Sequence, residues 1–425
     1  MEELLHYVWE HRLFQKDLKT TDGLSIEVID VGLHNTNDGA DFFNAKIKID
    51  DHVWAGNIEI HKKSSDWKKH KHDLNPVYNT VILHIVEIAD CDISSSAGDK
   101  IPQCEISYPK HIKDNAEYLL FSNISTPCSN YIRTIPQIYV NGWINSLLLE
   151  RLERKSNDIA SWLKQFNGSW DDVFYVLLTR SFGFGLNSDS FEQLALSLPL
   201  RYIQKQRNNI EEIEALLFGQ AGMLDNIEKE DNHTKALKQE YNNLKVKYSL
   251  TPLKPYIFRK MSIRPGSHPH IRLAQLAALL YKEDKLFSKI VTCSDAGRIR
   301  LMLHENASEY WQTHYSFGEE SLRKSKFVGD ASLDILIINA VVPLLFTYGK
   351  YIGDEALCDR AISFLETIKA ESNSITRDFK NAGLHIQSAY DSQAAIQLKR
   401  EYCEKRKCLF CRIGYNILTE GNTQP

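Results

Sequence analysis

Residues 41–61 read DFFNAKIKIDDHVWAGNIEIH, and this stretch decides the fold of the N-terminal part of the chain. Apolar and polar residues alternate over 42–49 and again over 51–61, with a short polar turn between the two runs. A period of two is typical of strands with one buried face, and two such runs joined by a short turn indicate a β-hairpin. We therefore predict two antiparallel strands here.

The flanking segments extend this hairpin into a small mixed domain. Residues 2–14 place apolar side chains at helical spacing, residues 24–32 (LSIEVIDVG) are typical of a strand, and the HNTNDGAD segment at 34–41 indicates a loop. After a polar stretch with one or two helical turns, residues 77–90 (VYNTVILHIVEIAD) indicate a buried central strand, because the run is dense in Val and Ile. The predicted order is helix, three strands, short helix, strand.

From about Pro109 onward, helical periodicity dominates. The clearest helical segments are 140–166, 170–184, 190–204, 209–224 and 233–248. The run LDILIINAVVPLLFTYGKYI at 333–352 indicates a buried helix with a proline kink, too punctuated for a membrane span. We predict an α+β protein with an α/β domain at 1–115, an all-helical region at 116–400 and a cysteine-rich segment at 401–425 that packs back on the body.

The totals exclude several classes of protein. A chain of 425 residues, 43% hydrophobic and 25% charged, has the composition of a soluble globular protein with more than one core. The formal net charge of −4 gives no global attraction to nucleic acid or membrane, so such contacts need a local patch. The N-terminus lacks the features of a secretory signal. We expect a cytoplasmic protein without membrane contact.

Two carboxylates and a histidine are expected to meet at one end of the hairpin. Asp41 opens the first strand, and Glu59 and His61 lie near the end of the second. Because strand side chains alternate, Glu59 and His61 point to the same face, and Asp41 can approach them. Converging carboxylates suit Mg²⁺ or Mn²⁺, and a bound ion can activate water for attack on a phosphodiester. In the structural alternative, Asp41 caps a turn and Glu59 forms a surface ion pair.

A basic stretch follows these residues directly. Its members are Lys62, Lys63, Trp67, Lys68, Lys69 and Lys71. Such side chains can hold phosphates and stack on a base, so we predict that they bind a nucleic-acid substrate. A solvated lysine-rich loop is the alternative.

Further histidines widen the set of candidate ligands. His70 and His72 form a His-x-His pair, and His84 lies in the apolar strand that follows. If these histidines join Glu59 and His61, the interpretation becomes a zinc or manganese hydrolase. A hydrogen-bonded core residue is the alternative for His84.

Three cysteines lie close together near the C-terminus, namely Cys403, Cys408 and Cys411. In a reducing compartment such clustering indicates Zn²⁺ or an iron-sulfur cluster such as [4Fe-4S], with packing or free thiols as the alternative. Both metal centres need a fourth ligand from a distant segment, and Cys128 is the first choice. The remaining distant candidates are Cys104, Cys293 and Cys358.

Several segments together resemble the bacterial family catalogued as domain of unknown function 2851. They are GADFFNAKIKI, WAGNIEIHKKSSDWKKHKHD, VYNTVILHIV, LLFGQAGML, IRPGSHPHIRLAQLA and YCEKRKCLFCRIG. The resemblance spans nearly the whole chain and implies no established activity. A more apolar residue is expected near Ser267 and His268, so these two receive no role.

The N-terminal part is also similar to the restriction-endonuclease-like PD-(D/E)xK fold. By position, the resemblance makes Asp41 and Glu59 metal ligands, lets Ile60 lend its carbonyl, and places His61 where that fold has a lysine. A neutral imidazole cannot replace the fixed charge of an ammonium, although it can act as a base or ligand. A metal shared by Cys128 and the three late cysteines is similar to the iron staple of some helicase-associated and exonuclease members of this superfamily. In those members one early and three late cysteines hold a [4Fe-4S] cluster, and the spacing between the late cysteines differs from the spacing here.

These observations lead to one leading hypothesis and two alternatives. The first is a metal-dependent nuclease in which Asp41 and Glu59 hold the ion, His61 assists proton transfer and the lysines position the strand. The alternatives are a non-catalytic nucleic-acid-binding or scaffold protein with a structural metal, and a zinc hydrolase of a small molecule. No glycine-rich phosphate loop occurs, and the GQAG segment at 219–222 is interpreted as a turn or close helix packing.

Overall fold

The computed structural model describes residues 2–35, 37–225, 227–261 and 263–420, so the last five residues of the predicted 401–425 segment lie outside it. The chain divides into two compact units. The first comprises Met1–Trp143, Asp378–Leu384 and Leu398–Pro425, and the second comprises Ile144–Arg377 and His385–Gln397. Segments from both ends of the sequence therefore build the first unit.

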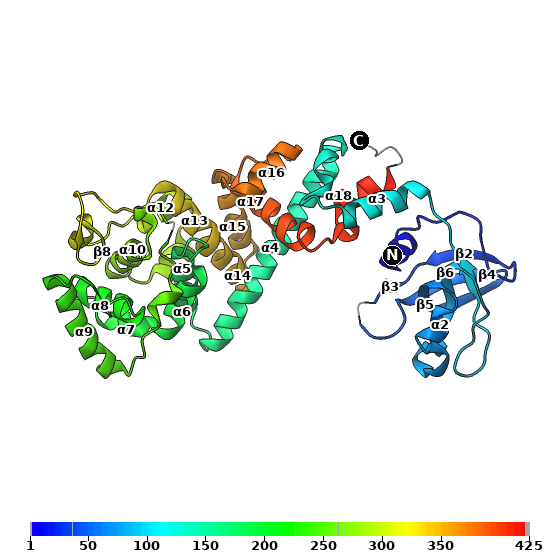
Figure 1. The fold of residues 1–425 in the computed structure, drawn as a ribbon, viewed down its shortest axis with the longest axis horizontal. Helices are drawn as coiled ribbons and strands as arrows, with labels where there is room; N and C mark the ends of the chain where they lie inside the picture. The colour runs from blue at the N-terminus through cyan, green and yellow to red at the C-terminus, as the bar shows by residue number, and fades with distance from the viewer. Residues whose placement is uncertain (1, 36, 226, 262, 421–425) are drawn as a thin grey trace. The chain divides into compact units, whose positions relative to one another are not determined.

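The described part of the first unit contains a mixed sheet of seven strands (Figure 1). The strands are β1 (Leu18–Lys19), β2 (Ser25–Asp30), β3 (Leu33–His34), β4 (Phe42–Ile49), β5 (His52–Lys63), β6 (Val81–Ile88) and β7 (Gln103–Glu105). They are ordered β1-β2-β4-β5-β6-β7, with β3 beside β4. The pairs β2·β4 and β4·β5 are antiparallel, whereas β5·β6 and β6·β7 are parallel. The predicted hairpin and the predicted central strand are both confirmed.

The alternation in the sequence explains the burial of the hairpin. In β4, Phe42, Ala45 and Ile47 are buried while Lys46 is exposed, as expected for a strand with one face in the core. Helix α1 (Glu2–Glu10) contacts β5, and its Leu4, Leu5, Tyr7, Val8 and Trp9 are buried. This packing brings the N-terminal helix to the strand that carries Glu59.

The remaining helices of the first unit come from both ends of the chain. They include α2 (Asp66–Lys69), α3 (Lys110–Phe121), α18 (Arg412–Thr419) and short helical turns at Pro127–Asn130, Leu398–Cys403 and Cys408–Phe410. Helix α18 contacts α3, and Asn115 Nδ2 donates a hydrogen bond of 2.9 Å to the carbonyl of Ile417. The C-terminal segment is thus held against α3.

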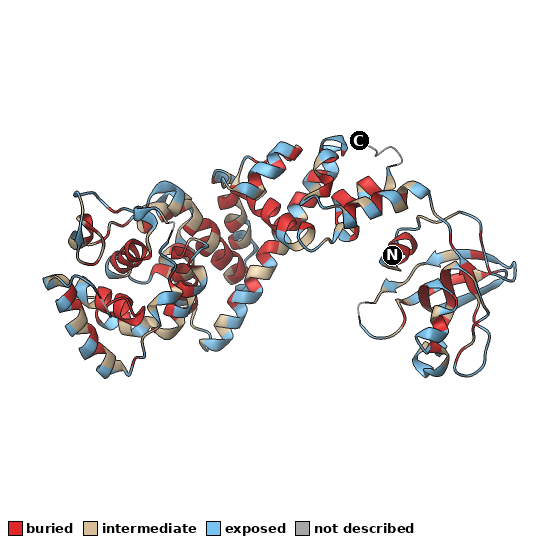
Figure 2. Cartoon of the chain, viewed as in Figure 1, coloured by how far each residue is buried: buried red, intermediate tan, exposed pale blue. Residues whose placement is uncertain are grey.

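The second unit is built mainly of helices whose inward faces are buried (Figure 2). They are α5 (Trp170–Phe182), α6 (Ser188–Ser197), α7 (Leu200–Lys205), α8 (Ile210–Gln220), α9 (Asn232–Tyr248), α10 (Pro269–Lys282), α11 (Leu286–Thr292), α12 (Ala296–Leu303), α13 (Asp330–Leu336), α14 (Val342–Ile352), α15 (Glu355–Thr367) and α17 (Ala389–Gln397). Helices α4 (Gln137–Gln165) and α16 (Ser374–Ala382) each run across a boundary between the units.

The prediction of an all-helical region is wrong at one place. A small antiparallel hairpin joins β8 (His314–Ser316) to β9 (Glu319–Glu320). Gly318 lies in its turn with a φ of 70°, a conformation that residues with a Cβ rarely adopt. Strands this short carry no usable periodicity in the sequence.

The apolar stretch Asp330–Ile352 is helical throughout, with a π-helical turn at Ile337–Val341 before Pro343. A proline lacks the backbone N–H that would continue the α-helical ladder, so an irregular turn here fits the predicted kink. By length and composition the stretch could cross a membrane, but 67% of its most apolar window is buried inside the protein. The core helix of a soluble protein has the same character.

Candidate metal site

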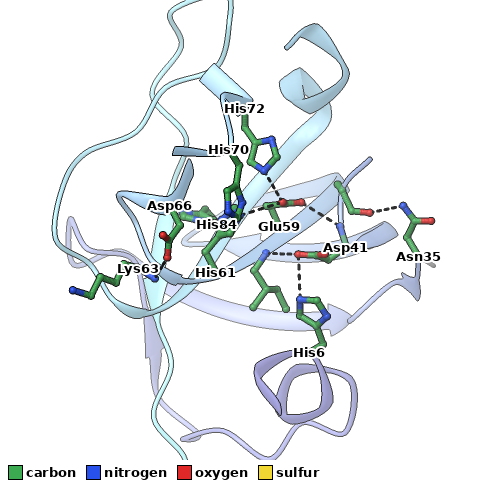
Figure 3. A network of polar contacts seen from close by, with 12 residues as sticks. His6, Asn35, Asp41, Glu59, His61, Lys63, Asp66, His70, His72 and His84 are labelled. Carbon is green, nitrogen blue, oxygen red and sulfur yellow. Dashed lines mark hydrogen bonds and ion pairs between the residues drawn. The ribbon is translucent and has the colours of Figure 1, made fainter. Parts of the chain in front are cut away.

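The parallel pairing of β5 and β6 places Glu59 beside His84, with His61 two residues further along β5. His70 follows α2, and His72 begins the next short helical turn. Between these two histidines, Lys71 adopts a left-handed backbone with a φ of 62°. This turn brings both imidazoles back toward β5 (Figure 3).

Three imidazoles and one carboxylate converge at this point. One nitrogen from each of His61, His70 and His72 lies within 4.8 Å of the other two. His61 Nε2 lies 3.1 Å from His70 Nδ1 and 3.6 Å from Glu59 Oε1. His72 Nε2 lies 3.2 Å from the same Glu59 oxygen. Nitrogen ligands this close together, with a carboxylate beside them, form a donor set suited to a transition-metal ion.

A chain of hydrogen bonds fixes the tautomer of His61. Gln103 Nε2 donates to the carbonyl of Cys91 at 2.9 Å, so its Oε1 is the atom that faces His84 Nδ1, at 3.3 Å. His84 therefore carries its proton on Nδ1, and its Nε2 accepts a proton from His61 Nδ1 at 2.8 Å. The lone pair of His61 is then on Nε2, the atom that faces His70, His72 and Glu59. A second group that orients the ring in this way is typical of metal-binding histidines.

Burial keeps the rings of His61 and His84 neutral. Glu59 is 4% exposed, His61 2% and His84 0%. Burial, followed by the neighbouring histidines, lowers the pKa of His61 to about 2, and burial lowers the pKa of His84 to about 4. Burial also raises the pKa of Glu59. A ring with so low a pKa is a weak base near neutral pH, which argues against the proton-transfer role predicted for His61 and favours a ligand role.

Asp41 lies next to this cluster, but its contacts are mainly to backbone groups and one helix. The N–H of Ile60 donates to Asp41 Oδ2 at 2.8 Å, and the N–H of Asp41 donates to Glu59 Oε2 at 3.2 Å. His6 Nε2 from α1 lies 3.4 Å from Asp41 Oδ2. Burial lowers the pKa of His6, but the hydrogen bond and the charge of Asp41 outweigh it, so the pKa is raised. That Asp41 and Glu59 share Mg²⁺ or Mn²⁺ stays a prediction.

His6 is a member of the site that the sequence did not reveal. Its position in the N-terminal helix gives no hint of Asp41, because the contact depends on how α1 packs on β5. Gln103 was missed for a similar reason, since β7 has three residues and no recognisable pattern.

The basic stretch is exposed except for its aromatic residue. Lys62, Lys63, Lys68 and Lys69 are all on the surface, which both the predicted contact with phosphates and the alternative of a solvated loop require, so their binding of nucleic acid stays a prediction. Trp67, however, is 0% exposed, and its Nε1 donates to the carbonyl of Ser94 at 3.0 Å. The predicted stacking of Trp67 on a base is therefore wrong: this ring packs in the core beneath the site.

The four cysteines predicted to share a metal all belong to the first unit. Cys128 lies in the helical turn Pro127–Asn130, and Cys403 ends the π-helical turn. Cys408 begins the last 3₁₀ turn, and Cys411 directly follows it. The turn that carries Cys128 contacts α18, which directly follows Cys411, and the turn at Cys408–Phe410 contacts the turn that ends at Cys403, so the four cysteines lie in one region of the unit. The alternative fourth ligands are elsewhere: Cys104 lies in β7, and Cys293 and Cys358 belong to the second unit.

The fold and the site define an α+β protein with a histidine-rich candidate metal site on a mixed sheet. The model of the family described as "Protein of unknown function (DUF2851)" matches residues 2–374. The chain therefore belongs to this family, as the sequence predicted. No curated protein and no solved structure matches the chain.

Proposed function

We propose that this protein is a metal-dependent hydrolase of nucleic-acid phosphodiesters whose ion is held by His61, His70 and His72, with Glu59 beside it. The observation that supports this proposal most directly is that one nitrogen from each of the three histidines lies within 4.8 Å of the other two. Imidazole nitrogen suits Zn²⁺ and other transition metals, whereas Mg²⁺ prefers oxygen ligands in octahedral geometry. The proposal therefore favours Zn²⁺ or Mn²⁺ over the Mg²⁺ expected from two carboxylates alone.

An ion with three protein ligands keeps a position for water and lowers the pKa of that water toward neutrality. His70 is exposed while His61 is buried, so the ligand set has one side turned to solvent. Substrate can approach from that side. Glu59 accepts the N–H of Asp41 through Oε2 and leaves Oε1 facing His72, either as a further ligand or as an acceptor for the attacking water.

The order of elements supports the resemblance to the restriction-endonuclease-like fold. Helix α1 precedes the antiparallel strands β2, β4 and β5, and helix α2 leads to the parallel strand β6. Asp41 directly precedes β4, and Glu59 lies on β5, the positions that this fold gives to its two carboxylates. His61 replaces the lysine of the motif, and the additional histidines supply ligands that the motif lacks.

The exposed lysines beside the site favour a polyanionic substrate over a small neutral one. Lys62 directly follows His61, and Lys68 and Lys69 lie in the helix that precedes His70. Lysine side chains in this position can hold phosphates next to the ion through charge alone, without reading the base sequence.

The test uses the full chain, freed of metal and reloaded with Zn²⁺, Mn²⁺ or Mg²⁺, on single- and double-stranded DNA and RNA. We expect cleavage with a transition metal, and a loss of more than about 100-fold in His70→Gln and His72→Gln, since even outer-shell changes cost about 10–100-fold. The matched control is His52→Gln, because His52 is exposed at the opposite end of the same strand. Cleavage that survives both site variants contradicts the proposal.

A structural metal site is the second candidate, because His61 and Glu59 are almost fully buried. In that case the chain binds one transition-metal ion and cleaves none of the four substrates, and His72→Gln lowers the melting temperature of the metal-loaded protein without affecting any activity.

A further inference from the structure

A second group of candidate ligands lies in the first unit, apart from the histidines. It is formed by Cys128 and by Cys403, Cys408 and Cys411 near the C-terminus. The turn that carries Cys128 contacts both α3 and α18, and the turn at Cys408–Phe410 contacts α3 and the turn that ends at Cys403. Cys408 Sγ also lies 3.5 Å from the carbonyl of Leu119 in α3. Two stretches remote in sequence, 110–130 and 398–419, therefore meet at these thiols.

The local backbone is built to hold the thiols in place. Arg406 has a left-handed backbone with a φ of 51°, which reverses the chain between Cys403 and Cys408. A Cβ on Gly414 would lie 2.0 Å from the carbonyl oxygen of Cys408, so α18 can approach this turn only with glycine at that position. The loop between the thiols is thus tightly packed against the helix that follows it.

Three of the four cysteines are buried, and two cations lie near the group. Cys128, Cys403 and Cys411 are each less than one tenth exposed. Two cations lie near the turn that carries Cys128: Lys399 Nζ donates to the carbonyl of Ser125 at 2.9 Å, and Arg406 Nη2 donates to the carbonyl of Ser122 at 2.8 Å. Within the described residues, Arg406 Nη1 is buried without a hydrogen-bond partner. A metal bound by four thiolates carries negative charge, and positive charge next to buried thiols offsets it.

Zinc and an iron-sulfur cluster require different separations between their sulfur ligands. A single zinc ion with Zn–S bonds of about 2.3 Å holds its four sulfurs about 3.8 Å apart. Within the described residues, the ligand atoms that all lie within 4.8 Å of one another are those of His61, His70 and His72, and these sulfurs do not form such a group. In a [4Fe-4S] cluster each thiolate binds a different iron, so the four sulfurs are spread around a larger centre.

We propose that Cys128, Cys403, Cys408 and Cys411 bind a [4Fe-4S] cluster that fastens the C-terminal segment to α3 and to the turn at Pro127–Asn130. The cluster is structural: each thiol loses its proton to solvent, the resulting thiolate binds one iron, and no further reaction is required. This site is independent of the proposed hydrolase activity, because none of its ligands belongs to the histidine group.

The experiment measures the metal content of the full chain purified without oxygen. We expect about four irons and four acid-labile sulfides per chain and a broad absorbance near about 400 nm. Cys408→Ser and Cys128→Ser are expected to lose most of the iron and sulfide. The matched controls are Cys293→Ser and Cys358→Ser, which change cysteines of the second unit and keep the full content.

Two results on the unmodified protein overturn the proposal, whatever the folding of the variants. One is stoichiometric zinc without sulfide, and the other is the absence of both iron and zinc from a folded chain in which all four thiols react with an alkylating agent. Full iron and sulfide in Cys408→Ser and Cys128→Ser would also overturn it. Metal content and nuclease activity test the two sites separately, because His72→Gln is expected to abolish cleavage and to keep the iron and sulfide of the cluster.

Discussion

Gln103 Oε1 lies 3.3 Å from Nδ1 of His84, and this contact determines which nitrogen of His61 is free to bind a metal. Because the amide nitrogen of Gln103 is occupied by the carbonyl of Cys91, the side chain presents only its acceptor to His84. In the proposed site Gln103 is a positioning residue, because it acts on His61 through the ring of His84 and would contact neither an ion nor a substrate.

Gln103→Met is expected to weaken metal binding. Methionine has a similar length but offers no comparable acceptor, so His84 and His61 can change tautomer and present a protonated nitrogen to the ion. Loss of such an outer-shell partner lowers metal affinity by about 10–100-fold. Equilibrium dialysis with Zn²⁺ measures the change, and urea unfolding of the metal-free protein controls for a general loss of structure. An unchanged affinity would exclude the tautomer argument.

Removing two exposed lysines is expected to weaken nucleic-acid binding uniformly over sequences. In the double variant Lys62→Gln with Lys68→Gln, the logarithm of the binding constant should depend less steeply on the logarithm of the salt concentration. The slope should become shallower by about 0.7–0.9 for each phosphate that the protein no longer neutralises. The control combines Lys46→Gln and Lys110→Gln, which are also exposed but lie on β4 and at the start of α3. Fluorescence anisotropy with a labelled single strand measures both slopes. Equal slopes in the two double variants would rule out the basic stretch as the binding surface.

The rings of His61 and His84 are expected to make the metal-free first unit less stable as the pH falls below about 6.5. Burial lowers the pKa of His84 to about 4 and that of His61 to about 2 in the folded chain. Below pH about 6.5 His61 and His84 take up protons in the unfolded chain but stay neutral in the folded chain. The contribution of each ring to the free energy of unfolding is therefore complete above that pH and is lost as the pH falls toward the pKa of the folded chain. The loss is at most about 1.4 kcal/mol per pH unit for each ring.

Urea unfolding in the presence of a chelator from pH 7 to 4.5 measures this dependence. His84→Gln should give a shallower decline of the free energy of unfolding with falling pH, whereas the exposed His52→Gln should leave the decline unchanged. The same slope in the wild-type protein and in His84→Gln would show that His84 does not cause it.

Gly219→Ala is expected to destabilise the second unit. A Cβ on this residue of α8 would lie 2.1 Å from the ring of Tyr241 in α9, so the helices must separate or the ring must move. Forcing extra atoms into a packed core costs about 1–3 kcal/mol. Gly266→Ala is the control, because a Cβ there would meet no atom within 4 Å and the substitution should change the free energy of unfolding by less than about 0.5 kcal/mol. Equal melting temperatures of Gly219→Ala and Gly266→Ala would contradict the packing argument.

The sheet could be predicted because its main strands carry local patterns. The alternation in 42–49 and 51–61 determined the hairpin, and the Val and Ile run determined β6. The same alternation correctly placed Glu59 and His61 on one face, as their 3.6 Å contact confirms. These features depend on neighbours in the sequence, so the sequence alone reveals them.

The rest of the site depends on contacts between segments that no local pattern encodes. The approach of His70 and His72 to β5 requires the left-handed backbone at Lys71, a residue type that gives no warning of that conformation. Trp67 was misjudged because its lysine neighbours indicated an exposed loop. In the folded chain the short helix α2 turns the ring inward, into a cluster with Ile93 and Ile101.

The discontinuity of the first unit has a consequence for protein synthesis. The ribosome delivers α3 and Cys128 early, and the chain then adds the whole of the second unit before the segment that begins at Leu398. Until that segment emerges, Asn115 lacks the carbonyl of Ile417 and the apolar side of α3 has no covering helix. A premature stop codon before Leu398 would therefore damage the part of the protein that was translated first.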